Sequence, residues 1–330
     1  MRLNEYIAKR DRRLVLPWMG DTALRLTGAT AQDIYACPRR HLELVDYMER
    51  EFSADFVYPL DHGNLFAETL ALQIKPRADG FSCLGEPLLS HGEQLRQLSI
   101  PDPFHTGIMP AYLEALTMIA AHFAKPLALA LTGPFTLAAD LLGITELARA
   151  TVRSPLFVQE VMSFTTQVVR RFAQAAAESG VRLLCLSEPT AMILSPPSFK
   201  NIVSPYLQDI FSSLPPGVWR ILHVCGDSDH LLSQMLQCGA EGLSLDQVMD
   251  LPQVALQVPP EIVVIGNLDP VHVLRELDPE RVRQHTLQLL RSMQFFPNYL
   301  FSFGCDCTPD TPIENLKTAL EAAQIPLKDL

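Results

Sequence analysis

Short apolar runs alternate with longer, helix-forming stretches along most of the 330-residue chain. The runs are rich in valine, leucine and isoleucine, and each is followed by a turn and then by a stretch with helical periodicity. Parallel strands joined by helical crossovers produce this alternation. The runs that we predict as strands are 14–19, 55–60, 127–132, 182–187, 219–225, 242–246, 262–266 and 299–304. Eight strands close a barrel, so the pattern predicts an α/β fold of the (β/α)₈ TIM-barrel type.

A long segment separates the second and third predicted strands. Within it, residues 70–89 (LALQIKPRADGFSCLGEPLL) have the pattern of a β-hairpin, and we expect this hairpin to be inserted on the rim of the barrel. The chain is 48% hydrophobic and 19% charged, which provides enough apolar material for a large core. A length of 330 residues is ordinary for one barrel, so we predict a single domain over residues 1–330.

Composition and charge narrow the functional classes. The formal net charge is −11, so no basic field attracts a phosphate backbone, and we expect no nucleic-acid partner. No uninterrupted apolar run approaches the roughly 20 residues that a membrane span needs. The first residues also lack the apolar stretch of a signal peptide, which predicts a cytoplasmic protein without a membrane partner. The seven cysteines, an odd number, argue against a disulfide framework.

Polar residues gather at or just after the ends of the predicted strands. In a barrel the carboxyl ends of all strands share one face, and that face carries catalysis. The residues that we select as site candidates on this ground are Asp61, Thr132, Glu188, His223, Cys225, Asp246, Asn267 and Cys305.

Three of these candidates form a pattern typical of a metal site. His223 and Cys225 stand two residues apart at the end of an apolar strand (ILHVC), so both side chains point the same way, with Cα atoms roughly 6–7 Å apart. Cys305 ends the eighth predicted strand (FSFGC), which can converge with the fifth across the barrel mouth. One imidazole and two thiolates are a typical zinc set, and three protein ligands leave the open position of a catalytic zinc. Cys307 repeats the two-residue spacing and is an alternative or additional ligand.

Other interpretations of the same three residues stay open. Buried cysteines are common core residues, and a single histidine is more often only hydrogen-bonded. The residues could also form a structural zinc site in a carrier or regulatory barrel, although structural zinc usually has four protein ligands.

The remaining candidates have both a functional and a conformational interpretation. The candidate catalytic residues are Asp246, Glu188 and Asp61, and the candidate cofactor-binding residues are Asn267 and Thr132. Asp246 could hydrogen-bond His223 from behind the metal or contact substrate, and it could equally cap the loop and helix that follow. Glu188 and Asn267 lie in turns that contain prolines, where a purely conformational role is expected. Asp61 could position substrate or form an Asx turn.

Several segments resemble a known enzyme family. They are LTGPFTLAADLLG (131–143), SEPTAMILSPPSF (187–199), LHVCGDSDHLLSQMLQCGAEGLSLDQ (222–247), IGNLDPVHVL (265–274) and SFGCDCTPDTPIENLKTALEAA (302–323). From about Glu93 to the C-terminus, the chain resembles the methylcobamide:coenzyme M methyltransferases. These enzymes are the corrinoid-dependent branch of the uroporphyrinogen decarboxylase superfamily.

The resemblance implies a (β/α)₈ barrel with a zinc ion held by His223, Cys225 and Cys305. Zinc would bind the thiol of coenzyme M and remove its proton, because the thiolate is the nucleophile. The sulfur would then displace the methyl group of a methyl-Co(III) corrinoid. No corrinoid-binding domain is visible in the sequence, so the resemblance implies a separate corrinoid carrier protein as partner.

The resemblance does not fix the methyl acceptor. Coenzyme M carries a sulfonate, and the sequence does not tell which of Arg39, Arg77, Lys200 or a backbone site would bind it. Another thiol, or transfer between the corrinoid and tetrahydrofolate, is a further alternative.

A rival reaction also stays open. Uroporphyrinogen decarboxylases carry an arginine-bearing motif (PxWxMRQAGR) near the first strand. This chain has LPWMGDTALRLTG (16–28), with Gly20 and Asp21 where cations for the substrate carboxylates would be expected. Asp61 nevertheless falls where that enzyme places its key aspartate, which keeps a decarboxylase as the alternative function.

Overall fold

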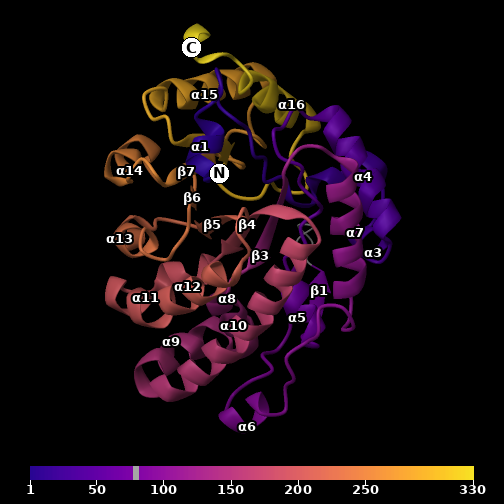
Figure 1. The fold of residues 1–330 in the computed structure, drawn as a ribbon, viewed down its shortest axis with the longest axis vertical. Coiled ribbons are helices and arrows are strands. Elements are labelled where there is room, and N and C mark those ends of the chain that lie inside the picture. Colours follow the sequence, from indigo (N-terminus) through magenta and orange to yellow (C-terminus); the bar gives the residue numbers. More distant parts are fainter. Residues whose placement is uncertain (77–81) are drawn as a thin grey trace.

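Six parallel strands form the central sheet of the protein (Figure 1). The structure is a computed structural model and describes residues 1–76 and 82–330. The strands pair in sequence order, and their bounds are β3 (Leu127–Thr132), β4 (Val181–Ser187), β5 (Trp219–Val224), β6 (Gly242–Leu245), β7 (Val263–Leu268) and β8 (Tyr299–Phe303). They correspond to the third through eighth predicted strands. The α/β fold with a parallel sheet is therefore confirmed.

The first two predicted strands differ from the prediction. Residues 14–19 and 55–60 contribute only isolated parallel bridges, in which Val15 pairs with Phe301 and Val57 pairs with Leu127. The reason lies partly in Asp55, whose carboxylate accepts the Val15 amide at 2.8 Å and thus takes the place of a backbone acceptor. The backbone amide of Asp55 in turn donates to the Val15 carbonyl at 3.0 Å. The two segments still lie between β8 and β3, although the regular ladder ends on either side of them.

Helices follow most of the strands and cover the outside of the sheet (Figure 1). Those between β3 and the C-terminus are α8 (Pro134–Leu142), α9 (Ile144–Arg153), α10 (Pro155–Glu178), η2 (Pro189–Ile193), α11 (Pro196–Ile202), α12 (Ser204–Ser213), η3 (Asp229–Leu231), α13 (Leu232–Met235), α14 (Leu251–Gln257), α15 (Pro279–Ser292), α16 (Ile313–Ala322) and η4 (Leu327–Asp329). The long α10 begins at a proline, which suits the first turn of a helix, and it packs on β3 and β4.

The first third of the chain is mainly helical and irregular. Its elements are α1 (Leu3–Ile7), η1 (Gly20–Ala23), α2 (Leu24–Thr27), α3 (Ala31–Tyr35), α4 (Pro38–Glu51), α5 (Leu65–Thr69), β1 (Ile74–Pro76), β2 (Ser82–Leu84), α6 (Gly92–Leu95) and α7 (Met109–His122). β1 and β2 pair in antiparallel fashion, with Ile74 opposite Leu84. The predicted hairpin at 70–89 includes these two strands, but its residues 77–81 lie outside the described part of the chain.

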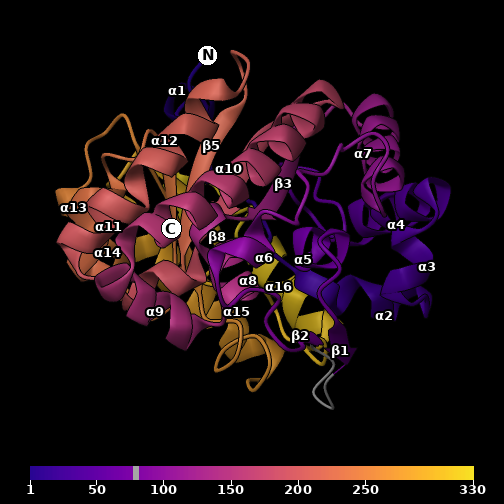
Figure 2. The same ribbon diagram turned by 90° about the horizontal axis from the view of Figure 1, so that it is seen from below.

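The two ends of the sheet have different neighbours. The Trp219 indole, at the start of β5, donates to the Met1 carbonyl at 3.1 Å, so the N-terminal segment covers the amino ends of the strands. Figure 2 shows β1 and β2 on the side of the molecule away from α1. The carboxyl ends of the strands carry the candidate site.

Among the helices of the described residues, none is both long enough and apolar enough to cross a membrane.

Candidate metal centre

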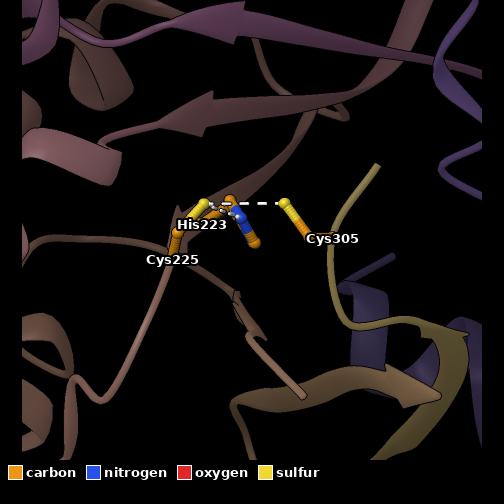
Figure 3. Close-up of side chains that lie close together, drawn as sticks. All are labelled: His223, Cys225 and Cys305. Atoms are coloured by element: carbon orange, nitrogen blue, oxygen red, sulfur yellow. Dashed lines mark hydrogen bonds between the residues drawn. The ribbon is translucent and has the colours of Figure 1, made fainter. Parts of the chain in front are cut away.

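His223, Cys225 and Cys305 come together at the carboxyl ends of β5 and β8 (Figure 3). His223 is the last but one residue of β5, and Cys225 follows that strand directly. Cys305 comes two residues after the end of β8. Gly304 lets the chain pass here, because a Cβ atom at this position would lie 2.5 Å from the backbone nitrogen of Gln247.

The spacing of the three ligand atoms suits a tetrahedral zinc ion. All three lie within 4.8 Å of one another, with 3.7 Å between the Sγ atoms of Cys225 and Cys305 and 3.0 Å from His223 Nε2 to Cys225 Sγ. Zinc bonds of about 2.0–2.3 Å separate tetrahedral ligands by roughly 3.5–3.8 Å. The sulfur pair thus already has a ligand-like separation, and the histidine contact needs to lengthen by about half an ångström.

The ring of His223 is oriented from behind by Ser244. Nδ1 lies 3.1 Å from the Ser244 carbonyl oxygen and 3.0 Å from its hydroxyl. A carbonyl can only accept, so Nδ1 carries the proton and the Nε2 lone pair faces the sulfur atoms. Ser244 was not among the site residues predicted from the sequence. The pattern that could have indicated its role is a lone serine in the apolar run GLSL, in the strand next to the one that holds His223.

The three side chains influence one another's protonation. Hydrogen bonds from Cys225 and His223 lower the pKa of the Cys305 thiol, whereas the hydrogen bond with Cys305 raises that of Cys225. Burial lowers the pKa of His223, but the hydrogen bond and charge of Cys305 outweigh burial and raise it overall. Metal ligands bind in their deprotonated forms, so a thiolate at Cys305 suits this role.

Cys307 does not join the group. Its side chain is buried, with 1% exposed, and burial raises the pKa of its thiol. Among the described residues, one group of three histidine, cysteine or acidic side chains could hold a metal ion, and it contains Cys305 and not Cys307. Cys305, the ligand predicted from the sequence, is therefore the cysteine that lies with His223 and Cys225.

A cavity of about 210 Å³ opens beside the three residues. The other residues that line it come mainly from β3, β4 and the connections after the strands, and they are Trp18, Asp61, Gly63, Ala130, Leu131, Thr132, Cys185, Ser187, Pro189 and Asp306. We name this space the inner cavity. Two further candidates, Asp61 and Thr132, therefore border the same space as the metal group. The Thr132 hydroxyl donates to the Gly63 carbonyl at 2.9 Å, so it also fixes the chain on the opposite wall.

Asp246 acts as a cap in this structure. Its carboxylate accepts the amide of Gly226 at 2.7 Å and the amide of Val248 at 3.1 Å. The hydrogen bond that we considered between Asp246 and His223 goes to Ser244 instead, because Ser244 is the residue opposite His223 in the register of β5 and β6. Gly226 directly follows Cys225, so Asp246 holds the turn that carries a ligand.

Glu188 and Asn267 are buried and engaged with backbone groups. The Glu188 carboxylate accepts the amides of Phe135 and Thr136 at 2.8 and 2.7 Å, which satisfies the first turn of α8. Burial raises its pKa to about 7, although these hydrogen bonds act in the opposite direction. The Asn267 amide donates to the carbonyls of Asp246 and Met249 at 2.9 and 2.8 Å. Both side chains thus have the conformational role that we gave as the alternative.

Comparison with protein families identifies one match over nearly the whole chain. The model of the uroporphyrinogen decarboxylase (URO-D) family matches residues 11–325. Among solved structures, a methyltransferase from Methanosarcina mazei superposes with a TM-score of 0.86 at 20% sequence identity, covering 98% of this chain and 97% of that one. At this identity the likeness concerns the fold.

Curated relatives include both branches that the sequence motifs indicated. The methylcobamide:CoM methyltransferase MtaA of Methanosarcina barkeri is 24% identical over 65% of this chain and 63% of its own length. MtbA of Methanosarcina acetivorans, with the same description, is 28% identical over 66% of this chain and 64% of its own length. A uroporphyrinogen decarboxylase of Thermus thermophilus is also 28% identical, over 66% of this chain and 64% of its own length. Each match thus spans less than two thirds of the relative's own length. The resemblance to the methyltransferases that the sequence motifs indicated is confirmed.

Proposed function

The chain belongs to the uroporphyrinogen decarboxylase (URO-D) family, and from this premise we propose that it is a zinc-dependent methyltransferase. The proposed donor is a methylated corrinoid on a separate carrier protein, and the proposed acceptor is a small thiol such as coenzyme M. Relatives named methylcobamide:CoM methyltransferase support both assignments.

One observation carries the proposal. His223, Cys225 and Cys305 place one nitrogen and two sulfur atoms within 4.8 Å of one another, next to the inner cavity. This donor set is typical of zinc, and three ligands leave a fourth position toward the cavity. Zinc, when bound there, would supply a Lewis acid that lowers the pKa of an incoming thiol. A cavity of about 210 Å³ has room for a small thiol beside the ligands.

The residues around the ligands have defined tasks in this proposal. Ser244 keeps the Nδ1 proton of His223 on the far side of the ring, so that Nε2 faces the metal. Asp246 holds the turn at Gly226 and thereby the position of Cys225. The walls formed by Trp18, Leu131 and Pro189 reduce access of water to the sulfur atoms.

The proposed reaction is a single displacement. The thiol would release its proton to solvent on binding, and its sulfur would form a bond to the methyl carbon of the methyl-Co(III) corrinoid. The cobalt–carbon bond breaks, and both of its electrons stay on cobalt, which becomes Co(I). The products are a methyl thioether and the Co(I) corrinoid. No external oxidant or reductant is needed.

A decarboxylase is the second candidate, and one observation favours it. Asp61, which the sequence resemblance places at the key aspartate of uroporphyrinogen decarboxylases, borders the inner cavity next to the metal group. The relative from Thermus thermophilus is as similar to this chain as MtbA is. Incubation with uroporphyrinogen, followed by chromatography of the oxidised porphyrins, separates the two functions. We expect no loss of carboxyl groups.

The experiment that tests the methyltransferase is anoxic absorbance spectroscopy of methylcobalamin mixed with zinc-loaded protein. Coenzyme M, homocysteine and tetrahydrofolate are supplied in parallel as acceptors. We expect conversion to the Co(I) spectrum with a thiol. Cys225→Ala should lose both zinc and activity, while the control Cys37→Ser, at a half-buried cysteine outside the metal group, should keep both. Undiminished zinc content in Cys225→Ala would refute the site, and conversion with tetrahydrofolate alone would change the acceptor.

A further inference from the structure

A second and larger cavity borders the inner cavity. Its volume is about 860 Å³, and we name it the outer cavity. The two cavities share three lining residues, Asp61, Gly63 and Asp306. The outer cavity extends from this junction toward α3, α5 and β1, where Tyr35, His62, Glu68 and Ile74 line it. A molecule in the outer cavity and a molecule in the inner cavity would therefore meet at this junction.

The two volumes suit ligands of different size. About 210 Å³ accommodates a small thiol but not a macrocycle, whereas about 860 Å³ lies at the upper end of the volumes of typical ligand pockets, about 300–1,000 Å³. The proposed reaction has one small and one large substrate. The sizes therefore indicate which cavity takes which substrate.

His62 marks the outer cavity as a binding site. Its side chain is 6% exposed, and its Nε2 atom has no hydrogen-bond partner among the described residues. A carboxylate oxygen of Glu68 lies 3.3 Å from Nε2 but outside hydrogen-bonding geometry. A buried polar atom without a partner costs free energy unless a ligand or water satisfies it.

The wall around His62 has a shape and a chemistry that narrow the ligand class. The Tyr35 ring stacks on His62 with 4.0 Å between centroids and 13° between planes, which gives a flat and rigid surface. Burial lowers the pKa of His62 to about 4, so the imidazole is neutral at pH 7 and offers one acceptor and one donor. Gln32 adds an uncharged amide to the same lining, whereas the Thr30 hydroxyl there is engaged with Asp33. Such a wall suits a large ring bordered by carboxamide groups, which is the chemistry of a corrin edge.

We propose that the outer cavity binds one edge of the corrin ring of the methyl donor, with His62 hydrogen-bonded to a peripheral carboxamide. This inference rests on the proposed function, because that function supplies the corrinoid. It adds a donor site that is separate from the acceptor site and assigns a contact residue to it. The methyl group then meets the thiol at the junction of Asp61, Gly63 and Asp306.

The test is a direct binding measurement that needs no turnover. Equilibrium dialysis against methylcobalamin gives its dissociation constant, and cobalt-substituted protein reports thiol binding through its visible spectrum. Ala36→Trp places a large side chain in the outer cavity from an exposed position at the end of α3. Its control is Asn201→Trp, at an exposed position that lines a separate groove between α10 and α11.

We expect Ala36→Trp to weaken methylcobalamin binding by about tenfold or more, because the new ring occupies the ligand's volume. Thiol binding and zinc content should stay as in the wild type, and Asn201→Trp should change neither ligand. His62→Gln, which keeps one donor and one acceptor at a different reach, should weaken methylcobalamin binding severalfold with thiol binding unchanged.

Three results would overturn the inference: no measurable binding of methylcobalamin to the wild type, equal binding in Ala36→Trp, or competition between methylcobalamin and the thiol for one space. Failure of the proposed function has a different signature. In that case the wild type would bind methylcobalamin and Ala36→Trp would not, yet the wild type would transfer no methyl group to any acceptor. This result would support the binding site and refute the methyltransferase.

Discussion

His223 and Ser244 face each other across β5 and β6, with the histidine Nδ1 atom 3.0 Å from the serine hydroxyl and 3.1 Å from the serine carbonyl. The contact fixes which ring nitrogen is free for a metal. We expect Ser244→Ala to lower zinc affinity by about tenfold, the low end for residues that hold metal ligands, because the carbonyl contact remains. Competition with a chromophoric chelator measures the change.

The matched control for that variant is Ser302→Ala. Ser302 is likewise fully buried in a strand, but its hydroxyl donates to the Leu16 carbonyl at 2.6 Å and not to a metal ligand. The Ser302→Ala variant should have a lower free energy of unfolding but an unchanged affinity for zinc. Equal loss of affinity in both variants would show that Ser244 acts only through stability.

Metal removal should lower the melting temperature. A ligand that binds only the folded state stabilises it by about 2.7 kcal/mol when its free concentration is 100 times Kd. We expect a zinc chelator to lower the transition of the wild type in differential scanning calorimetry. The transition of Cys305→Ser should respond to neither zinc nor chelator, and a zinc-dependent shift in that variant would place the metal elsewhere.

Gly304 should not tolerate a side chain. An alanine Cβ would lie 2.5 Å from the Gln247 nitrogen, so Cys305 or the neighbouring loop has to move. We expect Gly304→Ala to cost about 1–3 kcal/mol of unfolding free energy and to reduce zinc affinity. Gly63→Ala is the control, because a Cβ atom at Gly63 meets nothing within 4 Å. Urea titration with and without zinc separates the two effects.

Glu188 should make stability depend on pH. Burial raises its pKa to about 7, above the ordinary value of about 4.3, so the folded state keeps a proton that the unfolded state has lost between these pH values. The contribution of protonated Glu188 to the stability of the folded state is complete below pH 4 and decreases as the pH rises to 7. The decrease in the free energy of unfolding amounts to roughly 3–4 kcal/mol. Urea titrations of the wild type from pH 4.5 to 8 should show it.

Glu188→Gln has no proton to lose and should therefore flatten that pH dependence. Asp140 on α8, whose pKa burial also raises to about 7, contributes in the same direction, so part of the slope should remain. An unchanged slope in Glu188→Gln would show that Glu188 ionises normally in the folded protein.

The sequence predicted the parts of the fold and site that depend on regular patterns. Six strands agree with the prediction because continuous apolar runs define buried parallel strands. The grouping of His223, Cys225 and Cys305 follows from strand ends that share one face. The first two strands were wrong in extent, because a side-chain acceptor at Asp55 takes up the Val15 amide. Such a replacement leaves no trace in hydrophobic periodicity.

The roles of single polar residues were harder to predict. Asp246, Glu188 and Asn267 lie at the expected end of the sheet, but their hydrogen bonds go to backbone groups. Sequence position indicates that a polar residue is near the site, whereas its hydrogen-bonding partner depends on the direction of the side chain and on loops that follow no period. His62 and the outer cavity were not predicted for the same reason.

The isolated bridges at Val15 and Val57 also determine where the sheet resists opening least. Ladder hydrogen bonds link β3 through β8 without interruption, while the gap between β8 and β3 is spanned by a few backbone bonds and by the Arg12–Asp55 ion pair, with Nη2 and Oδ1 2.7 Å apart. Amide hydrogens in these two segments should exchange with deuterium before those of β4 to β7, because local opening begins where few bonds must break. Asp61 and His62 follow the second segment directly, so the most weakly joined part of the sheet leads into both cavities.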